Sequence, residues 1–475
     1  MSRLVVVSNR VSPPDSEGRG AQGGLAAAIA SSLREYSGIW FGWSGQATPS
    51  FTGRISMQRI GGVTVATTDL EEQDINEYYN GYANRTLWPL FHYRIGLTAY
   101  DRSFGEGYAR TNRRFAEMLY PLIERDDLVW VQDYHLIPLG RELRHRGVAN
   151  AIGFFLHIPW PARELIATLP KHRDLVESLF HYDVVGFQTD EWRDAFKSYV
   201  LYEVGGEEKA DGRLHAFGRS LKAETFPIGI DAQGFADLER EPAAHDSFER
   251  MKESKDGRRM IVGVDRLDYS KGLEERLLAY ERLLIDDPDL RRDVFLLQIS
   301  TSSRGEVPEY QEIAQRLDAL AGRINGANAE MDWVPIRNVH RFHSREELFG
   351  IYRAAEVGLV TPLRDGMNLV AKEYVAAQDP SNPGVLILSR FAGAAAQMKQ
   401  ALIVNPFSQE EVAEAIKRAL AMPLEERRAR WASLIEAVRA QDVYRWRDDF
   451  VRCLEHARGE RQAAYAAGGA SKLSR

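Results

Sequence analysis

Short apolar runs that alternate with helical stretches constrain this chain more than any other feature of its sequence. Leu4–Val7, Leu128–Gln132 and Val357–Val360 are typical examples. Short runs of this kind, rich in valine and leucine, predict strands that are buried on both faces, as in parallel sheets. The alternation of strand and helix therefore predicts an α/β fold made of doubly wound domains.

The chain has 475 residues, more than one hydrophobic core usually supports, so two domains are expected. Pro227–Asp231 is the expected boundary, because a second series of strands begins after it. The first series is Leu4–Val7, Leu128–Gln132, Ile152–Leu156, Val184–Phe187 and Ala223–Ile228. The second is Met260–Val264, Val294–Ile299, Met331–Val334, Val357–Val360, Val385–Leu388 and Leu402–Val404. These series place the two domains at residues 1–229 and 230–440.

The C-terminal region is expected to hold one helix followed by a disordered tail. Tyr444, Trp446, Phe450 and Leu454 recur at helical spacing and predict a buried face on a helix at 441–458. Residues 459–475 are mostly small and polar, which favours a frayed end.

Composition excludes several classes of protein. A net charge of -7 argues against a general nucleic-acid or anionic-membrane binder. The single cysteine, Cys453, cannot form an intrachain disulfide or a cysteine-based zinc site. No stretch is long and apolar enough for a membrane span, and Leu4–Val7 is too short for a signal peptide. A cytoplasmic protein is the simplest expectation.

Thr361–Glu373 combines a strand end, a tight turn and a helix start. Gly366 allows a bend in which the backbone approaches a ligand closely, and Asn368 is a plausible cap for the following helix. The N–H groups of a helix start favour anions, whereas Asp365 and Glu373 suit the hydroxyls of a sugar or ribose. An ordinary strand–helix loop with a capping aspartate and a solvated glutamate remains the alternative.

Cations occur at the expected strand exits of this acidic protein. Arg266 and Lys271 follow one strand, and their spacing before a glycine suits a diphosphate, because arginine grips two oxygens and lysine adds a point charge. Arg304 and Arg10 follow two other strands. Gly23-Gly24 opens a helix after the first strand and suggests a phosphate cradle, although such a pair is common before helices.

Two further site candidates follow from position alone. Asp133 and His157 stand just after expected strands, where ligands of open α/β sheets bind. A helix cap or a loop hydrogen bond is the alternative for each. Asp69–Tyr93 is rich in aromatic residues, Tyr79 and Trp88 among them, which can stack on sugar rings or simply pack in the core.

Together these loops suit a sugar that carries phosphate, bound between two domains. The chain lacks the Walker lysine motif, which disfavours a P-loop kinase. It also lacks the full dinucleotide fingerprint, which disfavours a dehydrogenase.

The motifs of this chain resemble those of the bacterial trehalose-6-phosphate synthase family. The resemblance is collinear over about residues 1–450. It rests on Met1–Arg10, Gly23-Gly24-Leu25, Trp40–Trp43, Glu77–Asn80, Leu87–Pro89, Asp133–His135, Gly153–Pro159, Asp265–Gly272, Ser302–Gly305, Gly322–Gly326 and Thr361–Pro380. It implies the GT-B fold, with two Rossmann-like domains facing a central cleft and a C-terminal helix crossing back to the first domain. It also implies a retaining transfer of glucose from UDP-glucose to glucose 6-phosphate.

The resemblance further implies a role for each candidate residue. The first domain would hold the acceptor and the second the nucleotide sugar. The donor-binding residues would be Gly23, Gly24, Arg266, Lys271, His343, Leu369, Val370, Ala371, Lys372 and Glu373. The acceptor-binding residues would be Arg10, Tyr79, Trp88, Asp133 and Arg304. Those nearest the reacting atoms would be His157, Asp133, Asp365 and Trp88.

No cofactor or metal is expected, because the cations and helix ends can neutralise a diphosphate. The expected partners are UDP-glucose, or another nucleotide-glucose, and glucose 6-phosphate, without nucleic acid or membrane. A homo-oligomer, dimer or tetramer, stays open. A related synthase with another acceptor, such as a glucosylglycerol-phosphate synthase, and a catalytically silent sugar-phosphate sensor are the alternatives, since one fold hosts many functions.

Overall fold

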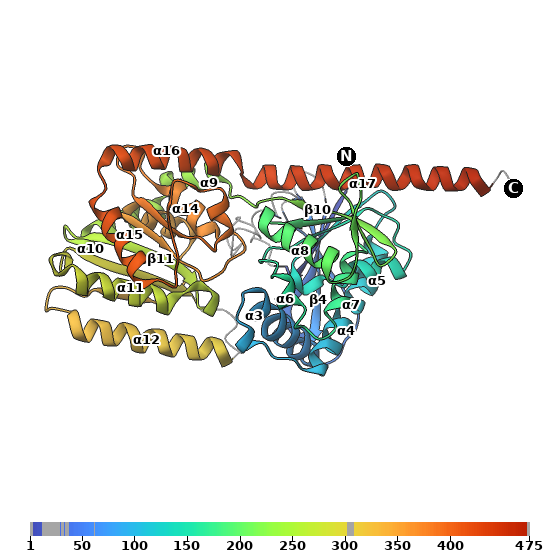
Figure 1. The fold of residues 1–475 in the computed structure, drawn as a ribbon, viewed down its shortest axis with the longest axis horizontal. Coiled ribbons are helices and arrows are strands. Elements are labelled where there is room, and N and C mark those ends of the chain that lie inside the picture. Colours follow the sequence, from blue (N-terminus) through green and yellow to red (C-terminus); the bar gives the residue numbers. More distant parts are fainter. Residues whose placement is uncertain are drawn as a thin grey trace. The chain divides into compact units, whose positions relative to one another are not determined.

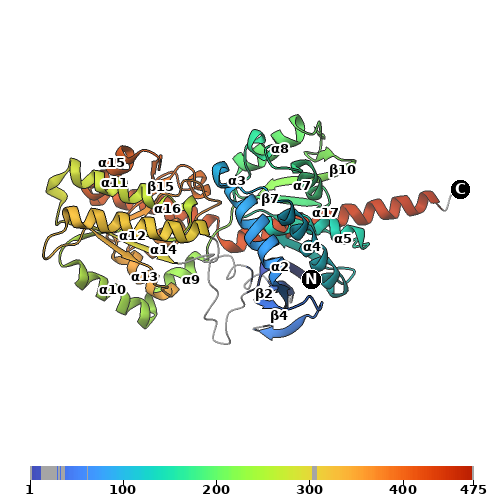
Figure 2. The same ribbon diagram turned by 90° about the horizontal axis from the view of Figure 1, so that it is seen from below.

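A computed structural model describes residues 3–11, 29, 33, 38–60, 62–301 and 308–472 of the chain. Two compact units make up the fold (Figures 1 and 2). The first consists of Met1–Pro227 together with Tyr444–Arg475, and the second of Ile228–Val443. Within the described ranges, no helix has both the length and the apolar character that crossing a bilayer requires.

The first unit is organised around one large sheet. Its strand order is β3-β4-β2-β1-β5-β6-β7-β10-β9-β8, and the strands from β4 to β10 in that order run parallel. The edge strands β3, β9 and β8 are antiparallel. The strands are β1 Leu4–Arg10, β2 Ile39–Thr48, β3 Ser56–Ile60, β4 Val63–Glu71, β5 Leu128–Gln132, β6 Ile152–Phe155, β7 Val184–Phe187, β8 Glu207–Glu208, β9 Leu214–Ala216 and β10 Arg219–Thr225.

Helices connect these strands. They are α2 Glu72–Asp74, a π-helical segment Ile75–Leu87, α3 Trp88–Phe91, α4 Arg102–Leu119, α5 Leu139–His145, α6 Arg163–Ile166, α7 His172–Leu179, α8 Asp190–Tyr202 and α17 Val443–Lys472, with 3₁₀ turns at Ile95–Leu97, Tyr120–Leu122 and Tyr134–Leu136. α17 packs Phe450 on Trp130 of β5, with ring centroids 4.5 Å apart, so the C-terminal segment completes the core of this unit.

The second unit contains a fully parallel sheet in the order β13-β12-β11-β14-β15-β16. Its strands are β11 Arg259–Arg266, β12 Val294–Thr301, β13 Ile336–Val339, β14 Val357–Val360, β15 Val385–Ser389 and β16 Leu402–Val404. The order reverses between β11 and β14. Doubly wound sheets bind ligands at such a switch point, outside the carboxyl ends of the strands.

Helices form two packed groups in this unit. One contains α11 Leu273–Asp286, α12 Pro308–Asn328 and α15 Gln409–Ala421, and the other α9 Ala232–Ala236, α10 Pro242–Lys255, α13 Arg345–Ala354, α14 Leu369–Ala377 and α16 Leu424–Ala440. Short 3₁₀ turns lie at Asp237–Arg240, Tyr269–Lys271, Pro288–Leu290 and Gly393–Ala396. Leu277 of α11, Ile416 of α15 and Ile261 of β11 share one fully buried core, which is why most of the apolar runs in this unit predicted strands.

Two of the expected strands differ from the structure. The strand expected at Met331–Val334 is wrong: Glu330 and Trp333 close a tight turn, and the strand is β13, after Pro335. Trp333 packs its ring in the core from this turn, and its Nε1 donates to Val294 O at 2.9 Å. The run is therefore apolar because a turn residue is buried and not because the segment is a strand. The strand expected at Ala223–Ile228 is β10, which begins earlier because Arg219–Leu221 pair with β9.

The C-terminal helix also differs from its prediction. Trp446, Phe450 and Leu454 are buried as expected, but Tyr444 is 37% exposed. α17 continues to Lys472, through most of the range where composition predicted a disordered tail.

Candidate active site

The exit loops of β11 and β14 lie against each other in the second unit. Leu363 N donates to Ser270 O at 2.8 Å. Gly272 has φ 63, and a Cβ on it would lie 2.5 Å from Thr361 O, so only glycine fits this contact. The switch point therefore brings together the two loops that the sequence indicated separately.

An ion pair joins the polar ends of these loops. Lys271 Nζ lies 2.5 Å from Asp365 Oδ2, and the Asn368 amide donates to the same oxygen at 3.0 Å. Asn368, at φ 71, also caps α14, since its Oδ1 accepts from Ala371 N at 3.3 Å. The predicted cap is confirmed. One lysine, one carboxylate and a helix start thus converge, and a helix start favours an anion.

A buried arginine of α11 contacts residues at the ends of β11 and β14. Arg276 of α11 is 1% exposed. Its guanidinium pairs with Asp265 at 2.6 Å, and it donates to Gln298 Oε1 at 2.9 Å and to Thr361 Oγ1 at 3.0 Å. Because Asp265 lies one residue before the end of β11 and Thr361 follows β14, this cluster fixes the spacing of the two exits. This cluster was not predicted from the sequence, although an arginine on an otherwise apolar helix face was the available signal.

The first turns of α14 hold the remaining donor candidates. Leu369 and Val370 are half-buried and Ala371 is buried. Lys372 is fully buried: its Nζ donates to Ile228 O at 2.8 Å, and burial lowers its pKa to about 7. Its side chain therefore faces the interior. Burial raises the pKa of the partly exposed Glu373 to about 7, against the opposing effect of Arg345.

Two other donor candidates lie on neighbouring strand exits. Arg266 ends β11 and is exposed. His343 follows β13 and is partly buried, which lowers its pKa, and its Nδ1 lies 3.5 Å from Glu347.

In the first unit the switch point lies between β1 and β5. Asp133 follows β5 with φ 73, an uncommon conformation for a residue other than glycine. Its Oδ1 accepts from the backbone N–H of His157 at 3.1 Å. The His157 Nε2 lies 2.8 Å from Gln132 Oε1, and burial lowers the pKa of this histidine to about 3. The two candidates therefore adjoin each other, and His157 stays neutral near pH 7.

Aromatic residues surround the same exits. Tyr79 stacks on His135, with ring centroids 6.0 Å apart, and the ring centroids of Trp88 and Tyr134 are 5.7 Å apart.

Arg10 ends β1 with an exposed side chain whose guanidinium lies 5.9 Å from the ring of Trp43. Gly23, Gly24 and Arg304 lie outside the described residues.

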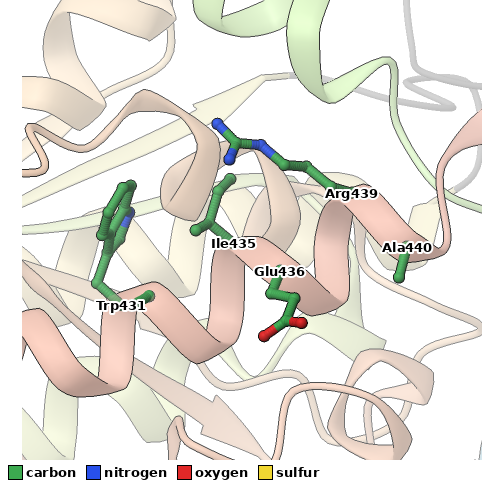
Figure 3. A pocket seen from close by; sticks show the side chains of 6 residues that line it. Trp431, Ile435, Glu436, Arg439 and Ala440 are labelled. Carbon is green, nitrogen blue, oxygen red and sulfur yellow. The ribbon is translucent and has the colours of Figure 1, made fainter.

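The structure also contains a cavity on α16 of about 560 Å³ (Figure 3). Trp431, Ile435 and Arg439 point to one side of the helix in that view, and none of the lining residues belongs to the exit loops. The loops rather than this cavity carry the convergent polar groups.

The doubly wound units and the groups at their strand exits define a glycosyltransferase of the GT-B class. The chain belongs to glycosyltransferase family 20, whose sequence profile matches residues 2–456.

Among curated proteins, the trehalose-6-phosphate synthase of Sinorhizobium fredii is 49% identical over 96% of this chain and 98% of its own. Two solved structures are similar over nearly the whole chain. The UDP-forming synthase of Burkholderia xenovorans, in complex with glucose 6-phosphate, is 49% identical with a TM-score of 0.92, and the match covers 95% of this chain and 100% of that one. The E. coli protein bound with UDP-2-fluoro glucose is 44% identical with a TM-score of 0.90, and the match covers 95% and 99%.

Proposed function

We propose that this chain transfers glucose from UDP-glucose to glucose 6-phosphate, giving α,α-trehalose 6-phosphate and UDP. The observation that carries this proposal is the 49% identity, over 95% of the chain, to a synthase solved with glucose 6-phosphate. The E. coli relative bound with a fluorinated UDP-glucose supports the donor. The enzyme is an α,α-trehalose-phosphate synthase (UDP-forming) by this assignment.

The second unit is proposed to bind the donor. Lys271 and the exposed Arg266 would contact the diphosphate and stabilise UDP as it leaves. The loop after β14 would hold the glucose, with Asp365 accepting from its hydroxyls. Asp365 already pairs with Lys271, so in the donor complex the Lys271 ammonium would contact both this carboxylate and a phosphate oxygen. Glu373 would accept from the ribose, aided by the start of α14.

The first unit is proposed to bind the acceptor. Tyr79 and Arg10 would hold the phosphate of glucose 6-phosphate, together with Arg304. Trp88 and Asp133 would orient the sugar so that the correct anomeric hydroxyl attacks. The strained backbone of Asp133 supports this role, since such conformations are typical of functional sites.

The stereochemistry requires retention, because an α-donor gives an α-linked product. A double displacement needs a carboxylate nucleophile below the donor carbon, whereas Asp133, Asp365 and Glu373 are assigned to hydroxyls. Burial lowers the pKa of His157 to about 3, so its imidazole is a weak base for the acceptor proton near pH 7. We therefore favour attack on the face that the leaving group vacates, with a phosphate oxygen of UDP taking the proton.

A product assay tests the function. Purified protein is incubated with UDP-glucose and glucose 6-phosphate, and the product is identified by NMR as α,α-linked. Glycerol 3-phosphate in place of glucose 6-phosphate tests the glucosylglycerol-phosphate alternative. Binding of both ligands without turnover would instead support the sensor. ADP-glucose and GDP-glucose in parallel reactions define the nucleotide.

We also propose a cytoplasmic location. Both substrates carry phosphate and do not cross membranes unaided, and the single cysteine, Cys453, gives no intrachain disulfide. Fractionation of cells producing the protein would test this, and recovery outside the cytoplasm would contradict it.

A further inference from the structure

A π-helical segment in the first unit carries one proposed acceptor residue and leads directly into another. Ile75–Leu87 is 13 residues long, whereas π-helical hydrogen bonding mostly occurs as single turns and frequently at functional sites. Tyr79 lies within it and Trp88 follows it. Its length is therefore a feature that needs a structural cause.

This segment faces the exit of β5. Tyr79 stacks on His135 with 16° between the rings, and Asn84 Oδ1 accepts from the hydroxyl of Tyr134 at 2.9 Å. Tyr79 and Asn84 are five residues apart. In an α-helix, five residues rotate the side chain by about 140°, but the i→i+5 bonding of a π-helix stacks such residues on one face. The π register thus lets both residues reach the same strand exit.

A buried charge cluster holds the start of the segment. Asp74, its preceding residue, has 0% exposure. Its Oδ1 accepts from Arg110 Nε at 2.9 Å and its Oδ2 from Arg114 Nη1 at 2.5 Å. Arg110 also donates to Glu77 at 2.8 Å, and Arg114 to Glu71 at 3.0 Å. Carboxylates at such depth are normally paired with cations in this way.

The two arginines belong to α4, which packs closely against the π-helical segment. A Cβ on Gly107 of α4 would lie 2.3 Å from Glu77 Cβ, and one on Gly81 would lie 2.5 Å from Phe104. The charge cluster and these glycine contacts together fix where the segment begins relative to α4.

We propose that Asp74, held by Arg110 and Arg114, is a positioning residue for the acceptor. The cluster sets the register of the π-helical segment, and that register places Tyr79 and Trp88 at the exit of β5. The inference rests on the proposed function, since those two residues are assigned to glucose 6-phosphate there. A purely structural cluster would stabilise the first unit without affecting one substrate more than the other.

Kinetics of four variants test the positioning role. Asp74→Asn and Arg110→Met break the cluster, and Arg110→Lys keeps the charge. Arg144→Met is the matched control, because Arg144 pairs with Asp183 at 2.8 Å in the same unit, beside the amino end of β7. Each variant is measured for kcat, for KM of both substrates and for melting temperature.

We expect Asp74→Asn and Arg110→Met to raise KM for glucose 6-phosphate about tenfold. A misplacement of 1 Å can slow a reaction about 100-fold, and a displaced binding residue should have a smaller effect. KM for UDP-glucose stays near the wild-type value. Arg110→Lys recovers most of the loss. Arg144→Met lowers the melting temperature and leaves both KM values unchanged.

An unchanged KM for glucose 6-phosphate in Arg110→Met, with a melting temperature lowered as in the control, would overturn the proposal. The Arg110 pair decides the result if Asp74→Asn does not fold. A wild-type protein that does not use glucose 6-phosphate would refute the proposed function itself, and the positioning role with it. An active wild type with unaffected variants refutes the positioning role alone.

Discussion

Lys271 and Asp365 are 94 residues apart in the sequence, yet their side chains form a 2.5 Å ion pair between the exit loops of β11 and β14. This pair places a cation and a carboxylate where the strand order of the second sheet reverses. In the proposed donor site these two groups would face the phosphates and hydroxyls of the nucleotide sugar.

Replacement of Lys271 should lower turnover and also weaken folding, because it leaves the half-buried Asp365 without its ion-pair partner. A charge-assisted hydrogen bond is worth about 1.5–3 kcal/mol, and the leaving diphosphate gains charge in the transition state. We expect Lys271→Ala to lower kcat/KM about 10- to 100-fold or more. Lys417→Ala is a matched control on α15, since Lys417 pairs with Asp287 at the surface. Wild-type kinetics in Lys271→Ala would show that this lysine is only structural.

Chelation should leave the reaction intact. In the proposed donor site, Arg266, Lys271 and the start of α14 would supply the positive charge that a metal ion would otherwise bring to the diphosphate. Activity in EDTA should match that of untreated enzyme, although added Mg²⁺ can modulate it. Complete loss in EDTA, restored by a divalent ion, would refute this prediction.

The acceptor phosphate should depend on Arg10 and Arg304. Replacement of either arginine by alanine should raise KM for glucose 6-phosphate about 10- to 100-fold and leave the affinity for UDP nearly unchanged. The preference for glucose 6-phosphate over glucose should shrink in proportion, because glucose never uses the contact. Arg59→Ala, which removes an exposed arginine on β3, is the control. An unchanged preference in Arg10→Ala and Arg304→Ala would exclude the acceptor role.

The neutral state of His157 predicts a pH dependence of stability. The pKa of a histidine in an unfolded chain is about 6.5, whereas burial lowers the pKa of His157 to about 3 in the folded protein. The unfolded state therefore binds an extra proton below pH about 6.5. The stabilisation of the folded state that comes from this pKa difference is fully present above that pH and is lost as the pH falls toward 3.

His157→Gln removes this titration. Its free energy of unfolding should fall less steeply than that of the wild type between pH 6 and 4, by at most about 1.4 kcal/mol per pH unit. Denaturant unfolding at several pH values measures both slopes. Equal slopes would mean that the wild-type histidine titrates normally.

Removal of Arg276 should destabilise the second unit strongly. The guanidinium is buried with Asp265, and loss of one partner of such a pair costs about 3–5 kcal/mol. Arg276→Met should therefore unfold at lower denaturant, and the double variant with Asp265→Asn should recover part of the loss. Arg282→Ala, on the exposed side of the same helix, should change stability little. A fully stable Arg276→Met would mean that the cluster contributes nothing.

The sequence by itself predicted most of the buried parallel strands and the loops that carry charge, but not β2, β3 and β4 or the position of β13. The strands Leu128–Gln132 and Val357–Val360 were predicted with the bounds that the structure shows. Asn368 was identified as a cap from its place before an apolar helix. These features are local, because burial on both faces and helix capping are recorded in neighbouring residues.

Only the tertiary structure decided which of these pieces meet. The pairing of Lys271 with Asp365 depends on β11 and β14 being neighbours, which no local pattern encodes. The buried Arg276 cluster draws on four separate elements. The π-helical register of Ile75–Leu87 accompanies contacts with α4 and the β5 exit, whereas its composition alone is that of an ordinary helix. Sequence patterns report how one element is buried, but the fold sets which elements are adjacent.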